Sequence, residues 1–540
     1  MSGIGRASVL IGAGTIVSRL TGFLRAVVLV SAIGATTAGG NAFAVANQLP
    51  NNIYAIISTG LLSAVVVPQI VKAAAHDDGG RAFVSKLFTL GAVVLLGTTI
   101  LATIAAPWLV ALYAPEYSPA QQALATAFAY WCLPQILFYG LFALVGESLN
   151  ARRVYGPYTW APIVNNIVSI AGFGAFIWLF GPGTPATDWT PEMIALLAGT
   201  ATLGIVVQCG ILFAFWRRTG LHVRPDFRWR GVGLGQIGRL AGWTFLMVLA
   251  GQLAGLVQSQ VLSGIPTGEP GFFVSQNAWL LFMLPYSIIV LSIGTPYFTQ
   301  LSEHATAGRK DEVRGDIGRS IRTLGLFVVA AAAALAVAAV PASRIFTDSR
   351  AEAADAAVVL VCFLVSLVPL AVLFVIQRTF YAYDDTRTPF FFTLVQCALV
   401  VATAFTADWA ADAGILPYSL LAAAVALGQS FSSLVQVIIA TWLLSRRLGG
   451  VGVGAWLPAL LRFAIAGVPA GAAGWFTFLL LGGVDGWTVS DKILGAVGAA
   501  IIGIVVLILY VGFLALLRAP ELSVAMGLVR RFLPGRRTAA

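Results

Sequence analysis

Long apolar stretches, separated by short polar connections, follow one another along nearly the whole chain. A helix that crosses a bilayer needs about 20 consecutive apolar residues, and these stretches reach that length. The pattern predicts fourteen transmembrane helices, at about 7–34, 43–72, 85–113, 120–149, 158–180, 192–216, 236–262, 272–300, 320–344, 353–382, 389–408, 415–444, 457–481 and 493–517. No connection is long enough for a soluble domain, so we expect an all-α polytopic membrane protein.

The polar connections alternate in charge. One set is rich in arginine and lysine, as in residues 217–230 and 309–322, whereas the other holds only Arg344, Arg350 and Lys492. The acidic residues of the second set are Glu116, Asp188, Glu192, Glu269, Asp348, Glu352, Asp355, Asp408, Asp412, Asp485 and Asp491. The positive-inside rule makes the first set cytoplasmic, and an even number of spans then leaves both termini in the cytoplasm.

Composition excludes several classes of function. Hydrophobic residues make up 59% of the 540 positions and charged residues 10%, so a soluble enzyme is not expected. The net charge of +10 lies on connections and on the tail, where it fits anionic lipid head groups better than nucleic acid. The apolar stretch of the first span continues to Ile33 without a small-residue cleavage pattern, so we expect it to be retained rather than removed as a signal peptide.

Motifs of catalysis and metal binding are missing from the sequence. There is no Gly-Lys dipeptide for a Walker A loop and no H-E-x-x-H. The three histidines fall on predicted cytoplasmic loops, and the four cysteines lie singly in apolar stretches. We therefore expect a protein that is not an enzyme and has no bound cofactor or metal. A membrane-embedded transferase stays open, although the short outer loops offer little room for its usual catalytic acids.

The chain repeats itself at a spacing of about 230 residues. Pro68 and Arg81 reappear as Pro296 and Arg309, and 296 − 68 = 228. His76, Gly80, Leu49-Pro50, Ala151 and Pro157 recur at offsets between 228 and 235, and Ala106-Pro107 corresponds to Val340-Pro341 at an offset of 234. An even number of spans per copy predicts two parallel six-helix lobes, at 1–217 and 218–447, that meet at a central cavity. Residues 448–518 would add two helices, and 519–540 a basic cytoplasmic tail.

Charged side chains inside a span usually face a cavity or a partner. Arg19 and Arg25 lie within the first span and fan over about 120° of the helix at 100° per residue. Intramembrane acids that could pair with them are almost absent. Structural pairing with a carbonyl stays open, but we favour a cationic cavity for an anionic substrate, since two guanidinium forks suit a phosphate or pyrophosphate.

Four further residues are candidates for a gate or the cavity. Glu147 and Arg378 lie near the cytoplasmic ends of the fourth and tenth spans, and 378 − 147 = 231. They could form an ion pair across the two lobes, or each could extend to the membrane interface. Pro50 and Pro285 each interrupt a helix hydrogen bond within a span, either as gate hinges or as ordinary kinks.

Several motifs resemble one family. They are Ser18-Arg19-Leu-Thr-Gly22-Phe23-Leu-Arg25; Asn41-Ala-Phe43-x-Val45-Ala46-x-x-Leu49-Pro50-Asn51; Val145-Gly146-x-x-Leu149-Asn150; and Arg378-x-Phe380-Tyr381-Ala382-x-x-Asp385-Thr386-Arg387-Thr388-Pro389. In spans 1–12 the chain resembles the MurJ/MviN lipid II flippases of the MOP exporter superfamily. The resemblance implies a bacterial plasma-membrane transporter that moves undecaprenyl-pyrophosphate-linked peptidoglycan precursor from the inner to the outer leaflet by alternating access.

The resemblance also implies roles for particular residues. Arg19 and Arg25 match the family's cavity arginines, and the last two spans match a groove for the polyprenyl tail. Asn41, Tyr54 and Thr59 replace residues that are commonly charged in the family. The arginine of many members in span 8 has no counterpart here, and no acid in spans 7, 11 or 12 supports a sodium site.

Two other functions stay open at this stage. The chain could be another MOP exporter, of a lipid-linked polysaccharide precursor or a drug, although two buried arginines disfavour a cationic drug. It could instead be a membrane scaffold for cell-wall synthesis proteins, in which case the cavity charges would be dispensable. Lipid II or a related polyprenyl-pyrophosphate lipid remains the expected cargo.

Overall fold

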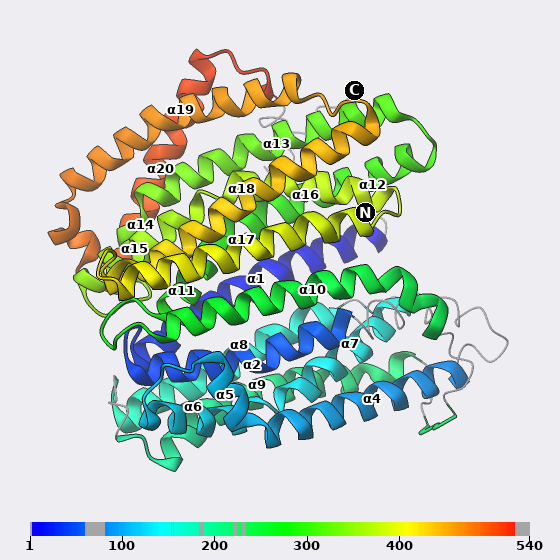
Figure 1. The fold of residues 1–540 in the computed structure, drawn as a ribbon, viewed down its shortest axis with the longest axis vertical. Helices are drawn as coiled ribbons and strands as arrows, with labels where there is room; N and C mark the ends of the chain where they lie inside the picture. Colours follow the sequence, from blue (N-terminus) through cyan, green and yellow to red (C-terminus); the bar gives the residue numbers. More distant parts are fainter. Residues whose placement is uncertain are drawn as a thin grey trace. The chain divides into compact units, whose positions relative to one another are not determined.

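The computed structural model describes residues 3–59, 81–152, 154, 156–182, 188–219, 224–228 and 234–523. Throughout these residues the regular structure is helical, and Figure 1 traces it from α1 in blue to α20 in red. Thirteen helices or helix pairs of the described part are long and apolar enough to cross a membrane. They correspond to thirteen of the fourteen expected spans. The remaining span, 43–72, lies partly outside the described residues, as do Pro68, His76, Gly80 and the tail from 524.

The chain divides into two compact units, 1–276 and 277–540. The first contains α1 (Gly3–Ile33), α2 (Ala38–Ile57), α4 (Arg81–Ile104), α5 (Ala106–Tyr113), α6 (Pro119–Cys132), α7 (Gln135–Ala151), α8 (Gly156–Phe180), α9 (Pro191–Phe215), the 3-10 turn η3 (Trp216–Thr219) and α10 (Leu234–Ser263). Helix α11 (Phe272–Pro285) crosses the boundary. The division into lobes at 217 and 447, with an appended pair and a tail, stays a prediction.

The second unit begins within α11 and contains the π-helix η4 (Tyr286–Leu291), α12 (Ser292–Thr306), α13 (Lys310–Val337), α14 (Ala339–Arg344), α15 (Arg350–Leu364), α16 (Leu367–Ala382), α17 (Arg387–Asp412), η5 (Tyr418–Leu420), α18 (Leu421–Leu448), α19 (Val453–Leu480), the 3-10 turns η6 (Gly483–Asp485) and η7 (Trp487–Val489), and α20 (Lys492–Leu516). It therefore includes both helices beyond the twelfth span.

Helix breaks divide several of the expected spans. Helix α4 ends at Ile104, shortly before Pro107, and α6 ends at Cys132, shortly before Pro134. A proline lacks a backbone N–H and clashes with the carbonyl four residues earlier, so it favours the start of a new helix over the interior of an old one. The spans predicted at 85–113 and 120–149 are consequently two helix segments each.

The helix boundaries recur at the spacing of the sequence matches. The end of α13 follows the end of α4 by 337 − 104 = 233 residues, and that of α15 follows that of α6 by 364 − 132 = 232. Ser118 and Ser349, which are 231 residues apart, each accept a hydrogen bond from the backbone N–H three residues on and so cap α6 and α15. The same succession of elements is thus built twice, while the parallel orientation of the copies stays a prediction.

Close helix packing in the first unit relies on small residues. Helix α8 packs between α1 and α9, and α10 packs on α2 and α5. A Cβ on Gly172 would lie 2.1 Å from the Thr200 hydroxyl oxygen, and one on Gly204 would lie 2.3 Å from Oδ1 of Asn165. Both glycines therefore allow α8 and α9 to approach closely, as is typical of membrane helices.

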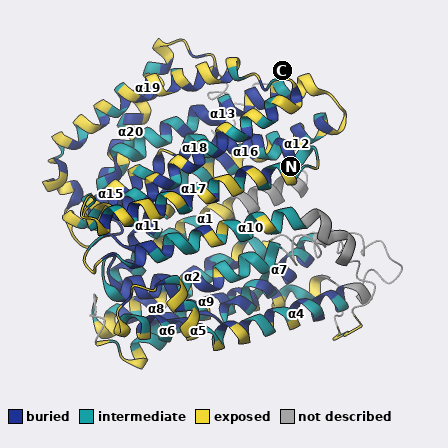
Figure 2. Ribbon diagram, in the orientation of Figure 1, coloured by how far each residue is buried: buried dark blue, intermediate teal, exposed yellow. Residues whose placement is uncertain are grey.

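Large apolar side chains are exposed along the outer faces, as Figure 2 shows for α19. Ile465, Val468 and Leu480 of that helix are 63%, 72% and 70% exposed. Such a surface is unfavourable in water but matches lipid hydrocarbon. The exposure pattern therefore agrees with a chain that is surrounded by membrane.

The last two long helices, α19 and α20, contact the rest of the second unit at both of their ends. At one end the buried guanidinium of Arg344 donates to the carbonyls of Thr347, Val489 (3.0 Å) and Ser490 (3.1 Å). At the other, the buried Glu521 carboxylate lies 3.8 Å from Arg322 and 3.6 Å from Arg462. Helices α19 and α20 are therefore held to α13 and α14 by charged contacts as well as by apolar packing.

Candidate cargo-binding and gating residues

Arg19 and Arg25 both lie inside the apolar part of α1. Helix α1 begins at Gly3, so Arg19 follows its first residue by 16 positions, and Arg25 precedes its last residue, Ile33, by eight. At 1.5 Å per residue these separations are about 24 Å and 12 Å. Both side chains are half-buried. Both arginines therefore belong to a helix that is long and apolar enough to cross a membrane.

Neither arginine forms a hydrogen bond or an ion pair with another residue in the described part of the chain. The Tyr139 side chain of α7 is close enough to interact electrostatically with Arg25. A charge inside a membrane is costly unless a partner, water or a ligand compensates it. Two guanidinium groups on one helix, without an ion pair among the described residues, are suited to an anionic ligand with several oxygen atoms.

Asn166 of α8 holds the arginine-bearing turn of α1 in place. Its Nδ2 donates to the Ser18 carbonyl at 3.1 Å and to the Thr21 hydroxyl at 2.9 Å. A Cβ on Gly22 would lie 3.5 Å from the same Nδ2, so the two helices are in close contact there. These contacts fix the rotation of α1 about its axis and hence the directions of Arg19 and Arg25.

A network of hydrogen-bonded polar side chains links helices of the same unit. Gln135, which is fully buried, donates from Nε2 to the Thr202 hydroxyl at 2.9 Å and to Asn47 Oδ1 at 3.5 Å. Its Oε1 accepts from the Tyr139 hydroxyl at 3.3 Å, and the Tyr139 ring lies 5.6 Å from that of Tyr54. Helices α2, α7 and α9 are thereby joined beside Arg25. This network was not predicted from the sequence, because single polar residues in apolar spans do not reveal their partners.

Glu147 lies in α7 and is half-buried. The phenols of Tyr54 and Tyr158 are close enough to interact with its carboxylate electrostatically. The Tyr158 ring stacks on Phe142 at 5.1 Å and would collide with a Cβ on Gly146. The acid therefore lies near two tyrosines, each of which has one polar group.

Arg378 lies in α16, on the cytoplasmic half predicted for the tenth span. Its guanidinium carbon is 5.0 Å from the centre of the Phe298 ring and 5.2 Å from that of Phe374. Stacking on ring faces leaves the in-plane N–H donors of the guanidinium group available to a further partner. Glu147 and Arg378 belong to different units, and the ion pair between them stays a prediction.

The two predicted kinks have different surroundings. Pro50 is buried inside α2, which continues to Ile57. Pro285 ends α11, and a π-helical segment follows it directly at Tyr286–Leu291. Such segments are rare and often occur at functional sites. The gating role of Pro50 and Pro285 stays a prediction, but the structure adds a local irregularity at the second position.

His304 is placed in the last turn of α12, whereas the sequence suggested a loop. It contacts two carboxylates of α13. Among the described residues there is no group of three or more His, Cys, Asp or Glu that could hold a metal ion. The hydrophobic periodicity of residues 292–306 is weak, because the segment is polar and contains Pro296. For this reason the helix predicted from the sequence ended at about residue 300, before His304.

Comparison with known proteins places the chain in one group. The family model for the lipid II flippase MurJ matches residues 29–517. The probable lipid II flippase MurJ of Rhizobium meliloti (strain 1021) is 28% identical over 409 residues, which cover 73% of this chain and 74% of that protein. The probable lipid II flippase MurJ of Synechocystis sp. is 23% identical over 529 residues and 94% of both chains.

Solved structures of the same fold include a lipid II flippase MurJ in an inward closed conformation. It superposes with a TM-score of 0.71 at 17% identity, covering 94% of this chain and 99% of the other. An inward-facing multidrug resistance MATE transporter of the MOP superfamily matches with a TM-score of 0.65 at 16% identity, over 82% and 98% of the two chains. At these identities the likeness establishes the fold, which is that of a polytopic helical membrane protein.

Proposed function

The chain belongs to the MurJ family of lipid II flippases and is a multi-pass membrane transporter rather than an enzyme, and we propose that it carries lipid II from the inner to the outer leaflet of a bacterial plasma membrane by alternating access. The family match covers residues 29–517, whereas Arg19 and Arg25 precede it. Their role therefore rests on the chemistry of the first span.

This proposal rests on Arg19 and Arg25, which form no hydrogen bond or ion pair with another residue in the described part of the chain. The pyrophosphate of a polyprenyl-linked precursor offers several anionic oxygens, and the forked donors of Arg19 and Arg25 are able to bind them bidentately. Asn166 supports this role because it binds Ser18 and Thr21, which lie next to and just after Arg19, and so holds the segment of α1 that carries both side chains. A segment held in this way limits the reorganisation that cargo binding requires.

A cytoplasmic gate would use residues of both units. Glu147 and Arg378 are proposed to approach each other when the inner side closes and to separate when it opens. Pro50 and Pro285 are proposed as the points at which the second and eighth spans bend. The π-helix after Pro285 supports the second hinge, because its backbone hydrogen-bond pattern departs from that of the helices on either side.

Other contacts concern the lipid and the cell envelope. Helices α19 and α20 are proposed to accommodate the polyprenyl tail, and the basic cytoplasmic connections to contact anionic head groups. Both termini are proposed to be cytoplasmic, from the charge alternation of the connections. Cell-wall synthesis proteins are proposed as further partners, which would place the flippase next to the enzymes that consume its cargo.

A leaflet-resolved measurement of lipid II in cells depleted of the protein tests this function. Depletion should cause lipid II to accumulate in the inner leaflet while its synthesis continues. Accumulation of a different lipid-linked precursor would identify another exporter of the MOP type. Unchanged leaflet distributions of all precursors, together with a cell-wall defect, would instead indicate a scaffold.

A further inference from the structure

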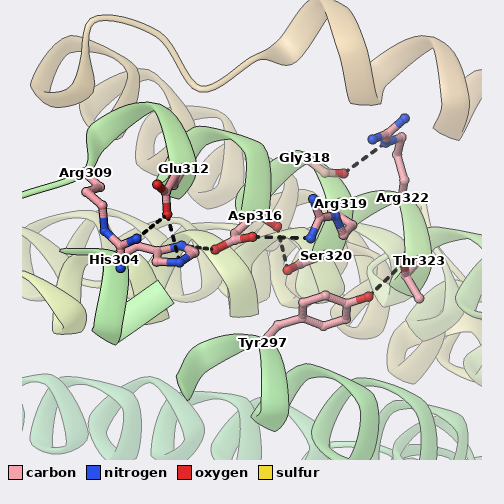
Figure 3. Close-up of polar contacts among 10 residues, drawn as sticks. All are labelled: Tyr297, His304, Arg309, Glu312, Asp316, Gly318, Arg319, Ser320, Arg322 and Thr323. Atoms are coloured by element: carbon pink, nitrogen blue, oxygen red, sulfur yellow. Dashed lines mark hydrogen bonds and ion pairs between the residues drawn. The ribbon is translucent and has the colours of Figure 1, made fainter. Parts of the chain in front are cut away.

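A histidine between two carboxylates joins the last turn of α12 to the first turns of α13 (Figure 3). His304 Nδ1 lies 2.7 Å from Oδ2 of Asp316, and Nε2 lies 3.0 Å from Oε2 of Glu312. The Asp316 side chain is 6% exposed and that of Glu312 is 47% exposed. Each ring nitrogen therefore faces its own acid, one inside the protein and one at its surface.

Two arginines contact the two carboxylates of this cluster. Arg309 Nη1 is 2.9 Å from Oε2 of Glu312, and Arg319 Nη1 is 3.8 Å from Oδ1 of Asp316. The Asp316 backbone carbonyl also accepts from the Ser320 hydroxyl at 2.7 Å. Glu312 thus has an alternative cationic partner when it leaves the histidine, whereas the one arginine near the buried Asp316 among the described residues is Arg319, at 3.8 Å.

Among the described residues, few charged groups lie on the other elements that pack against α12. Helix α16, which packs on α12, carries Arg378, and this guanidinium stacks on Phe298 and Phe374. The adjoining η4 contributes the phenol of Tyr286, and on α12 itself Glu303 is exposed. The remaining charged residues in the first turns of α13 are Lys310, Asp311 and Arg314, of which the last two pair with each other at 3.0 Å.

The two short distances from His304 to the carboxylates determine how many protons the three side chains share. A neutral imidazole has one N–H donor and one acceptor nitrogen, whereas an ionised carboxylate only accepts. Both contacts of His304 are therefore satisfied only if the ring is an imidazolium or if one carboxyl is protonated. In either case the three side chains together hold one proton more than a neutral histidine and two carboxylates would.

We propose that His304, Glu312 and Asp316 form a proton-binding site that latches α12 to α13, and that the latch opens when the site loses its proton. Histidine side chains commonly titrate between about pH 5 and 8. The latch is closed at low pH. As the pH rises and the proton leaves, one ring nitrogen presents a lone pair to a carboxylate, and the contact with the exposed Glu312 breaks first.

The position of the latch gives it a mechanical role. Helix α12 continues from η4 and Pro285, so the latch fixes the far end of the segment that contains the irregular turn. The hydroxyls of Tyr297 and Thr323, 3.3 Å apart, form a further contact between the two helices that does not involve this proton (Figure 3). The proton therefore controls the end of α12 and biases the helix without releasing it.

Hydrogen–deuterium exchange of the full chain in lipid nanodiscs tests the proposal without requiring transport, so its failure is distinct from failure of the proposed function. Backbone amides of residues 300–306 are measured between pH 5.5 and 8.5 and corrected for the intrinsic pH dependence of exchange. Protection should fall about tenfold with rising pH, the size of one hydrogen bond to a charged group. Protection that does not depend on pH would overturn the proposal.

Matched variants test whether the pH dependence of amide protection arises from His304 and its two carboxylates. His304→Gln keeps a polar side chain that does not titrate, so the pH dependence should disappear. Glu312→Gln changes a half-exposed residue with little risk to folding, and it should at least halve the pH effect. Tyr297→Phe and Glu303→Gln should retain the full pH dependence. A full pH dependence in either His304→Gln or Glu312→Gln would contradict the latch.

Discussion

Replacing Asn166 by alanine should loosen the segment of α1 that carries both arginines. The amide nitrogen makes two hydrogen bonds, at 3.1 Å and 2.9 Å, and its side chain is buried between the helices. Each bond contributes about 0.5–1.5 kcal/mol net, so the loss should be about 1–3 kcal/mol. That change shifts the equilibrium between docked and undocked α1 by roughly 5- to 150-fold. We expect cargo transport to fall because the arginines are no longer held in one orientation.

The matched control is the adjacent asparagine. Asn165 lies on the same helix, but its Oδ1 contacts Gly204 of α9 and accepts from Ser169 at 3.5 Å, away from α1. Asn165→Ala should therefore affect the α8–α9 contact and leave the arginine turn in place. Spin labels on α1 and α8 report the docking, and leaflet-resolved lipid II reports the transport. Wild-type docking and transport in Asn166→Ala would refute the reasoning, as would an equal defect in both variants.

Two further predictions concern topology and the gate. Membrane-impermeant thiol reagents applied from outside should label a cysteine placed at Asp485 but not one at Arg309; the reverse result would overturn the assigned orientation. Glu147→Arg and Arg378→Glu should each slow transport, whereas the double exchange should recover it. The interaction free energy between the two side chains should be under about 1 kcal/mol if the pair is exposed and larger if it is buried. Additive losses in that double-mutant cycle would mean that the two side chains never meet.

The helical architecture was largely predictable because it follows from apolar length and charge alternation. Spans without internal proline breaks, such as α17 and α18, agree with the predicted ranges to within several residues. The division of α4 from α5 depends on Pro107 and was missed, since a proline inside an apolar stretch is compatible with either a kink or a break. Apolar length alone does not distinguish these outcomes.

The candidate site was predictable only in part. A charge within an apolar span stands out, so Arg19 and Arg25 were identified from the sequence. Asn166 was not, because its role depends on the packing of α8 against α1, which residues 145 positions apart in the chain do not reveal. The same limit applies to His304, whose two acids become its neighbours only when α12 and α13 lie side by side.

The account depends most directly on Arg19 and Arg25, and transport of lipid II by arginine variants in a leaflet-resolved assay tests them. Arg→Ala at either position should abolish flipping while expression and membrane insertion remain normal. Arg→Lys should restore it partly, because lysine keeps the charge but loses the bidentate fork. Wild-type flipping by the double alanine variant would contradict the central claim that these two side chains bind the pyrophosphate of the cargo.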